Sequence, residues 1–263
     1  NALGAIGNAT SVPQLAELAA KGDAEIQSTA RASLAEMRGE DVDSAIAASI
    51  DKGDATVRRE LARALGSRRT KSAIPALLLA AADADSSVRA EGFASLAAIA
   101  PADQLKPIVE LLAIEQDDIT RAEGEKAALA VLSRNNDPAF AAATVMSALP
   151  DVKQGIPAYC SILRVAGKIN DPTAYDALVG AAELKNTDVR TTAVRALSDW
   201  PNNAPMEKLI EVAQSVEDAS VRDIALRGYL RMVEFPDNLA DRAPQYDAAL
   251  KAARSAEDRK LVL

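Results

Sequence analysis

The residue types that carry most enzyme chemistry are scarce in this sequence. Its 263 residues contain no histidine and one cysteine, Cys160. Without histidine, the chain has no Ser-His-Asp or Cys-His catalytic group, no His-liganded zinc or haem, and no ordinary proton shuttle at neutral pH. One cysteine forms neither an internal disulfide nor a Cys-x-x-Cys metal site, so cysteine usage leaves the compartment open. We expect Cys160 to be a buried small residue rather than a nucleophile.

Asp and Glu side chains, 38 in all, are the remaining candidates for acid–base chemistry. Close pairs such as Asp83 with Asp85, and Asp117 with Asp118, fall in predicted turns. General acid catalysis instead needs a carboxyl group in an apolar cleft, where its pKa is raised. Glycine-rich phosphate-binding loops are also missing from the sequence. The sequence therefore predicts no enzyme, no catalytic residue, no cofactor and no metal ion.

The overall charge and hydropathy narrow the choice of partner. The formal net charge is −8 at pH 7, which argues against general binding to nucleic acid or to anionic membranes. The longest apolar run, Ile74 to Ala82, is far shorter than the roughly 20 residues that a transmembrane helix needs. We therefore expect no nucleic-acid partner and no membrane span.

A short phrase recurs along the chain and reveals an internal repeat. Its clearest copies place Val-Arg shortly after an aspartate, and weaker copies keep the same spacing. Identical tetrapeptides beginning at Arg89 and Arg121 locate one of the weaker copies. A fixed period of 31 to 36 residues is typical of solenoid proteins. The sequence contains seven such repeats. The anchor residues, 31 to 36 positions apart, are Ile26, Val57, Val88, Thr120, Ile156, Val189 and Val221.

Each repeat is predicted to consist of two helices, because apolar residues recur every three or four positions and strand signals are absent. The second helix begins just before the anchor. Three residues ahead of the anchor stands an N-cap, worth roughly 1 kcal/mol, and Lys153 is the exception. The caps are Asp23, Asp54, Asp85, Asp117, Asn186 and Asp218. The predicted first helices are Val12 to Lys21, Val42 to Asp51, Ser72 to Ala82, Ala102 to Ile114, Pro138 to Leu149, Pro172 to Glu183 and Ala204 to Ser215.

One stripe on each second helix is predicted to be buried, and it contains the anchor and the residues four and eight places later. The fourth position is small in six repeats and includes Gly92 and Gly124. A mid-helix glycine costs about 1 kcal/mol against alanine, so we expect neighbouring helices to approach closely there. The eighth position carries Leu34, Leu65, Leu96 and Leu197.

These residues resemble a known family, the HEAT-like repeats first described in phycobilisome lyases. The stretches beginning at Leu3, Ala64 and Val165, with their Leu-Gly and Ile-Pro phrases, carry the resemblance together with the capped Val-Arg anchors. It implies an all-α, right-handed α-α superhelix of about seven helix pairs plus partial units at both ends. First helices would lie on the convex side and second helices on the concave side. We expect a single domain over residues 1–263, cut from a longer polypeptide.

The arginine after each anchor is the most regular charged residue in the chain. In the resembled family this arginine pairs with a loop aspartate of its own or an adjacent unit, so the resemblance implies a structural ladder. Exposed pairs contribute only ~0–1 kcal/mol each, yet a continuous ladder fixes the register of a stack. Gln27 and Pro157 interrupt it. The ladder arginines are Arg58, Arg89, Arg121, Arg190 and Arg222.

Positions two and six after the anchor fall nearly opposite the buried stripe and are predicted to face the concave side. They hold a mixture of basic and small residues, so this surface is suited to an acidic segment or polymer. Ile162 is one of the positions expected there, and Arg68, Arg69 and Lys71 form a basic turn expected to be solvated. The candidate binding residues are Arg59, Arg63, Lys126, Arg195 and Arg227.

The sequence pattern and the family resemblance lead to three functional hypotheses. The first is a non-catalytic scaffold that binds a protein or peptide partner, or flanking domains of its own chain, on the concave surface. The second is an accessory module of a large bacterial enzyme, perhaps one outside the cytoplasm. The third, a bilin lyase or chaperone, rests on the resemblance alone. Deoxyhypusine hydroxylase, a HEAT-like enzyme, binds iron through His-Glu motifs, which a chain without histidine lacks. Oligomeric state and localisation stay open.

Overall fold

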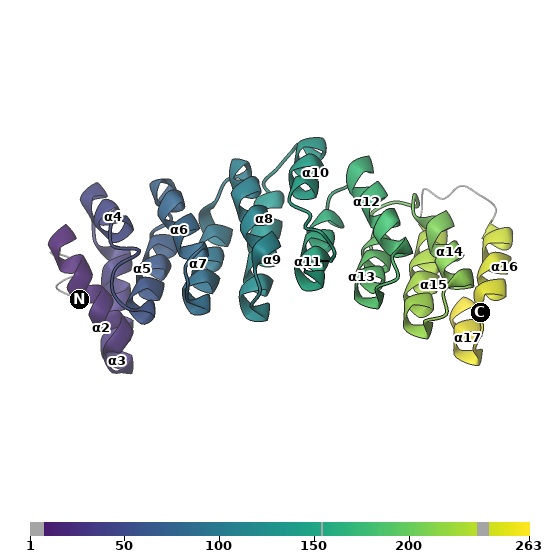
Figure 1. Ribbon diagram of the computed structural model, residues 1–263, viewed down its shortest axis with the longest axis horizontal. Helices are drawn as coiled ribbons and strands as arrows, with labels where there is room; N and C mark the ends of the chain where they lie inside the picture. The colour runs from purple at the N-terminus through teal and green to yellow at the C-terminus, as the bar shows by residue number, and fades with distance from the viewer. Residues whose placement is uncertain (1–7, 154, 236–241) are drawn as a thin grey trace. The chain divides into compact units, whose positions relative to one another are not determined.

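The computed structural model describes residues 8–153, 155–235 and 242–263, and this part of the chain is helical, with no strand (Figure 1). It contains sixteen α-helices and three short 3-10 helices. The all-α class, with successive helix pairs stacked as in an α-α superhelix, is confirmed. The chain divides into two compact units, Asn1–Asn136 and Asp137–Leu263, which are called unit 1 and unit 2 here.

Unit 1 is built from four helix pairs, α2 with α3 through α8 with α9. Three of the first helices carry a 3-10 turn at their start. The elements are η1 (Ala9–Ser11), α2 (Val12–Lys21), α3 (Ala24–Glu36), α4 (Glu40–Ala47), α5 (Ala55–Arg68), η2 (Lys71–Ala73), α6 (Ile74–Ala81), α7 (Ser86–Ile99), η3 (Ala102–Gln104), α8 (Leu105–Ile114) and α9 (Asp118–Leu132).

Unit 2 contains four further pairs within its described residues. The last pair is the partial unit expected from the sequence, whereas the partial unit expected at residues 1–7 lies outside the described residues. The elements are α10 (Pro138–Ser147), α11 (Ile156–Ala166), α12 (Pro172–Glu183), α13 (Thr187–Ser198), α14 (Met206–Ser215), α15 (Ala219–Val233), α16 (Arg242–Ala252) and α17 (Ala256–Val262).

Helix boundaries agree closely with the sequence pattern, and where they differ the cause is local. The predicted helices Val12 to Lys21 and Pro172 to Glu183 are observed with those bounds. The predicted helix Ser72 to Ala82 is instead a 3-10 turn followed by α6, which starts with Pro75 in its first turn. Proline lacks an N–H and has a fixed φ, so it favours the first turn of an α-helix.

The six predicted N-caps are all formed. Each cap side chain accepts a hydrogen bond from a backbone N–H in the first turn, as Asp54 does from Val57 at 3.1 Å and Asn186 does from Val189 at 3.0 Å. The same bond is made by Asp23, Asp85, Asp117 and Asp218. Each satisfies a donor that the helix itself leaves unpaired, so these residues fix where the second helices start.

The buried stripe is present in most second helices. The anchors Val57, Val88, Val189 and Val221 are 0–5% exposed, and the four leucines at the eighth position are fully buried. Ile26 is different, because it is 42% exposed. The prediction of a buried anchor is wrong for this repeat.

The register of α11 is the second departure from the pattern. Its N-cap is Gly155, so the residue three places later is Ala158 rather than the predicted anchor Ile156. Ala158, Ile162 and Ala166 are 0–3% exposed and form the buried stripe. The sequence frame was two residues early, because neither Lys153 nor Gly155 resembles the acidic caps. The placement of Ile162 on the concave surface is therefore wrong.

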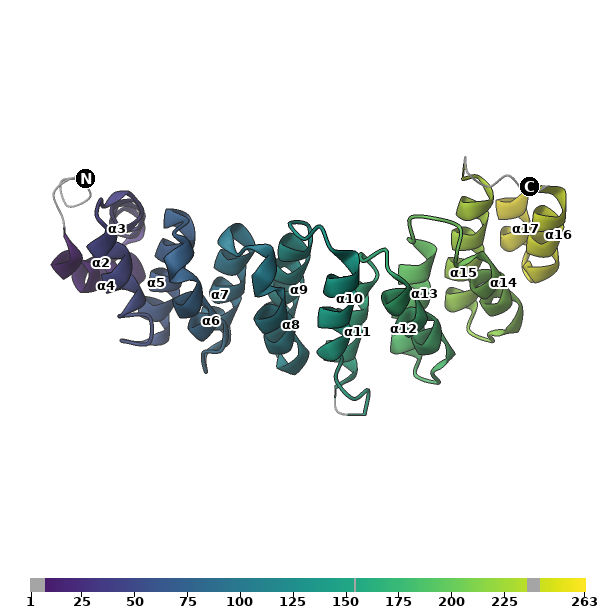
Figure 2. The ribbon, with the colours of Figure 1, turned by 90° about the horizontal axis from the view of Figure 1, so that it is seen from above.

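Within each unit the second helices pack more closely than the first helices. In unit 1, α7 packs extensively against α5 and α9, whereas α6 and α8 share few contacts. Figure 2 shows the helix pairs of a unit following one another side by side. We call the exposed surface of α5, α7 and α9 in unit 1, and of α11, α13 and α15 in unit 2, the second-helix face.

Gly92 shows why the fourth position after the anchor is small. A Cβ atom added there would lie 2.5 Å from the backbone nitrogen of Ala81 in α6. Backbone atoms cannot move aside as a flexible side chain can, so α6 and α7 can approach this closely only at glycine. The expected close approach is therefore observed at this position.

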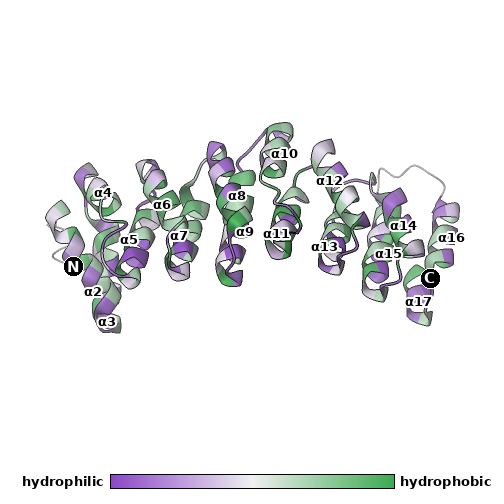
Figure 3. Cartoon of the chain, in the orientation of Figure 1, coloured by the Kyte–Doolittle hydropathy of each residue, from purple (hydrophilic) through white to green (hydrophobic). Residues whose placement is uncertain are grey.

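Hydrophobic and hydrophilic residues alternate along the helices (Figure 3), as amphipathic packing requires. None of the helices described in the structure is both long and apolar enough to span a membrane.

Candidate functional site

The ladder arginines of unit 1 form ion pairs from one repeat to the next. Arg58 donates to both carboxylate oxygens of Asp83, at 2.7 and 2.8 Å, and to the carbonyl of Gly53 at 2.8 Å. Arg89 makes the same fork to Glu115, at 2.7 and 2.9 Å. Each guanidinium therefore ties its own turn to the following repeat, and bidentate pairs of this kind are both strong and directional.

The acidic partners are not the N-caps. Asp83 and Glu115 each stand two residues before a cap, and each also accepts from the backbone N–H of that cap residue at 2.8 Å. The hydrogen bond from Arg58 holds the pKa of Asp83 below its usual value. Burial raises the pKa of Glu115, but the hydrogen bonds from Arg89 and from the Asp117 amide outweigh burial and leave the pKa lowered.

Among the described residues, the other ladder arginines have no such partner in the next repeat. Arg121 donates to the carbonyls of Glu115 and Gln116 in its own turn and pairs with Asp118. Arg222 likewise donates to the carbonyls of Val216 and Glu217. The buried Nε of Arg190 has no hydrogen-bond partner among the described residues. Gln27, expected to interrupt the ladder, still donates to the carbonyl of Gly22 at 3.0 Å.

A second set of arginines, which the sequence pattern did not reveal, lies near the ends of second helices. Arg68 donates to the carbonyls of Leu34 and Met37, one repeat earlier, at 2.9 and 2.6 Å, and pairs with Asp43. Cations at this end of a helix complement its unpaired carbonyls and its dipole. The expectation of a solvated turn is therefore wrong for Arg68. Arg134 contacts the carbonyls of Ala97 and Ala100, and Arg231 contacts those of Ser198 and Trp200.

A charged network crosses the second-helix face of unit 1. The side chain of Glu60 is fully buried and accepts from Arg31 at 2.7 and 2.8 Å and from Arg63 at 2.9 Å. Arg63 also donates to Glu91 on the next helix at 2.6 Å. The network therefore links α3, α5 and α7. Glu60 and Glu91 occupy the third position after their anchors, a position that sequence reasoning overlooked although Glu123 repeats it.

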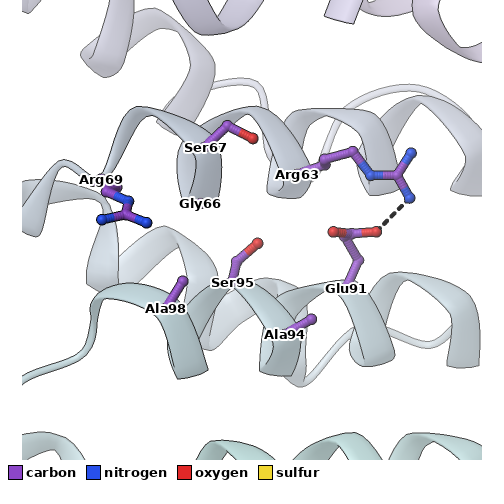
Figure 4. A pocket seen from close by; sticks show the side chains of 8 residues that line it. All are labelled: Arg63, Gly66, Ser67, Arg69, Glu91, Ala94, Ser95 and Ala98. Atoms are coloured by element: carbon purple, nitrogen blue, oxygen red, sulfur yellow. Dashed lines mark hydrogen bonds and ion pairs between the residues drawn. The ribbon is translucent and has the colours of Figure 1, made fainter. Parts of the chain in front are cut away.

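Two adjoining hollows lie over α7 on this face. One, of about 440 Å³, lies between α5 and α7, and the ion pair of Arg63 with Glu91 closes one end of it (Figure 4). The other, of about 490 Å³, continues toward α9 and is also lined by Arg59 and Ile119. Arg63, Glu91 and Ala94 line both hollows. The face is therefore an open surface with charged and apolar groups, suited to contact with another molecule.

Of the remaining candidate residues, Lys126 and Arg227 are paired within their own helices. The Lys126 side chain, 67% exposed, lies 2.6 Å from Glu123 in the same helix. In unit 2, Arg227 is 61% exposed and pairs with Asp223 at 2.9 Å. Arg195 is exposed. The structure therefore brings Arg59 and Arg63 together in one hollow, while the other three stand apart on their helices.

No cluster of three or more Cys, Asp or Glu side chains that could hold a metal ion occurs among the described residues. Cys160 is 5% exposed, within α11. On the second-helix face of unit 1, Glu60 and Glu91 are engaged with Arg63, and Glu123 is engaged with Lys126. What this arrangement offers chemically is recognition by charge and shape.

Comparison with known proteins identifies the repeat. A family model for HEAT repeats matches residues 42–128 and 158–229. No curated protein matches the sequence. Among solved structures, the CpcE–CpcF complex of phycocyanin lyase from Nostoc is 18% identical, with a TM-score of 0.39, covering 90% of this chain and 92% of that chain. Human deoxyhypusine hydroxylase, solved with glycerol, is 17% identical, with a TM-score of 0.38, covering 100% and 98%.

An engineered protein is 20% identical, with a TM-score of 0.43, and the alignment covers 96% of this chain and 76% of that chain. The repeated anchors, the capped helix pairs and a family match over more than half of the sequence lead to one conclusion: the chain belongs to the HEAT-repeat family.

Proposed function

We propose that the protein is a non-catalytic scaffold that binds a partner protein on its second-helix face. The observation that carries this proposal is the pair of adjoining hollows over α7, which expose arginine, glutamate and apolar groups together. A stack of helix pairs offers such a surface over its whole inner side. The lack of histidine in the sequence and the engaged state of the carboxylates agree with a role in binding.

The charges on this face favour a protein partner over a polyanion. Two of the three basic candidates of unit 1 are already paired, Arg63 with Glu60 and Glu91, and Lys126 with Glu123. A polyanion would have to displace these carboxylates or lie beside them, which costs electrostatic energy. A protein surface with both signs of charge meets the same groups without that cost. This refines the sequence-based expectation of an acidic segment or polymer.

The test is capture of partner proteins from a lysate of the source cells by the immobilised chain. Arg63→Ala, Lys126→Ala, Arg195→Ala and Arg227→Ala should each reduce capture of any partner that uses the face near them. Lys106→Ala is the matched control, because Lys106 is an exposed cation on the first helix α8, with its side chain 66% exposed. Capture that is unchanged in all four variants, or that falls equally with the control, contradicts the proposal.

A further inference from the structure

The residues around the two hollows form a trough, which we name the α7 trough. Its floor is α7, and its walls are α5 on one side and α9 on the other. The floor residues are Ala90, Glu91, Ala94, Ser95 and Ala98, the α5 wall is Arg59, Arg63 and Arg69, and the α9 wall is Asp117, Ile119 and Glu123. We propose that the α7 trough binds an amphipathic α-helix of a partner protein, with acidic residues on one edge and basic residues on the other. This inference rests on the proposed scaffold function.

The floor favours a helix over an extended peptide. Its methyl groups recur every four residues, about 6 Å apart along the helix axis, and form a ridge of the kind that packs against a second helix. Small side chains allow the two helix axes to approach closely. An extended peptide would need partners for its backbone N–H and C=O groups. The floor alanines offer none, Glu91 is engaged with Arg63 at 2.6 Å, and the Ser95 hydroxyl already bonds to the carbonyl of Ala62 at 3.0 Å.

The α5 wall favours an acidic edge on the bound helix. The buried Nε of Arg59 has no hydrogen-bond partner among the described residues, and its guanidinium lies 3.6 Å from Glu60. Arg69 is exposed at the end of α5, in a left-handed conformation with φ 55°. Figure 4 shows Arg69 at the opposite end of the hollow from Arg63 and Glu91. A carboxylate on the bound helix would face the guanidinium groups of Arg59 and Arg69.

The α9 wall has the opposite sign and an apolar group. Asp117 and Glu123 line it, and Ile119 between them is 75% exposed. A lysine or arginine on the far edge of the bound helix would face the two carboxylates. An apolar residue of the same helix would cover the Ile119 side chain, whose exposure to water is unfavourable. The two walls together specify a helix with split charge, and they disfavour one with acid or base on both edges.

The probes are fluorescein-labelled helical peptides of about 18 residues, or five turns, titrated against the full chain at low salt. The split-edge peptide carries alanine and leucine on its ridge, glutamate on one edge and lysine on the other. Two comparison peptides share the ridge but carry glutamate on both edges or lysine on both edges. A fourth is the split-edge peptide with a central proline, which breaks the helix. We expect the split-edge peptide to bind at least about tenfold more tightly than the other three.

The protein variants locate the binding. Ala94→Trp fills the trough and should weaken binding of the split-edge peptide by about tenfold or more. Ala139→Trp is the control, because Ala139 is an exposed alanine on α10 in unit 2. Matching melting curves for the two variants would show that both are folded. Equal effects of the two tryptophans, or equal binding of the split-edge and proline peptides, overturn the trough proposal. A captured partner that needs Arg195 but tolerates Ala94→Trp also overturns it, while leaving the scaffold function standing.

Discussion

Both units are built from helix pairs, but they differ in the ion pairs that link one repeat to the next. In unit 1, Arg58 and Arg89 reach Asp83 and Glu115 in the following repeats. In unit 2 the corresponding position in the repeat that follows Arg190 is Val216. The third position after the anchor differs in the same way: unit 1 has Glu60, Glu91 and Glu123, whereas unit 2 has Ser161, Thr192 and Ile224.

What both units share is the apolar stripe. Val57 and Leu65 in unit 1, and Val189 and Leu197 in unit 2, are buried at equivalent positions. Hydrophobic burial stabilises by roughly 25 cal/mol per Å², whereas a partly exposed ion pair contributes about 1 kcal/mol or less. The comparison teaches that burial specifies the repeat and that the ion pairs are an addition in unit 1.

The largest expected effect is a charge placed in the stripe. Leu65→Asp and Leu197→Asp bury an unpaired carboxylate, and each should cost more than about 4 kcal/mol of unfolding free energy. Urea unfolding followed by circular dichroism measures this, with the fluorescence of the single tryptophan, the buried Trp200, reporting on unit 2. A small loss in one unit and a large loss in the other would show that burial does not act equally in both.

Removal of the buried carboxylate of Glu60 should lower the free energy of unfolding more than the equivalent substitution in unit 2. Glu60→Ala removes the carboxylate that Arg31 and Arg63 share. These arginine side chains are 36% and 35% exposed, so water screens part of the penalty, and we expect a loss of about 2 kcal/mol. The equivalent Thr192→Ala in unit 2 should cost less than about 0.5 kcal/mol. Equal losses in urea unfolding would remove the distinction between the units.

The arginines at the ends of second helices should behave alike in both units. Arg68→Ala and Arg231→Ala each leave buried carbonyls of the preceding second helix without a donor, and each should cost about 1–2 kcal/mol. Arg69→Ala is the control beside the first of them, because Arg69 is exposed. Thermal melts of the three variants measure the differences. A harmless Arg68→Ala would contradict the contacts with Leu34 and Met37.

The smallest effect concerns the dependence of stability on pH. The pKa values of Asp83 and Glu115 are lowered in the folded protein, so the unfolded chain binds more protons in acid. The stability that these pairs add is present above about pH 4, the range of unfolded carboxyl groups, and is lost as pH falls further. In the double variant Asp83→Asn with Glu115→Gln, the loss of unfolding free energy on acidification should be smaller by about 1 kcal/mol per pair. The measurement is the free energy of unfolding between neutral and acid pH. If this free energy depends on pH in the double variant as it does in the parent protein, the ladder pairs do not add the expected stability.

Much of the fold could be predicted from the sequence because its signals are local. A cap such as Asp54 acts on the next three residues, and a stripe such as Val57 with Leu65 repeats at helical spacing. The prediction failed at α11, where Gly155 replaces an acidic cap and the frame moved by two residues. Failure was local there because each repeat is recognised by its own cap.

The site was harder to predict because its contacts cross between repeats. Arg68 and Arg69 are adjacent in the sequence, yet the first is mostly buried against α3 and the second is exposed. Only the packing of α5 on α3 separates them. The acids at Asp83 and Glu115 did carry a signal, an acidic residue two places before an acidic cap. For Asp83 with Asp85 the spacing predicts only a turn.

Thiol labelling tests the central claim, that the stripe is buried while the second-helix face is open, most directly. In a Cys160→Ala background, single cysteines replace the buried Val88 and Val189 and the exposed Ala94 and Arg195. Under native conditions a small maleimide should label the two valine positions at least about 100-fold more slowly, because those sites react only after local unfolding. Similar rates at all four positions, in variants that melt like the parent, would contradict the account.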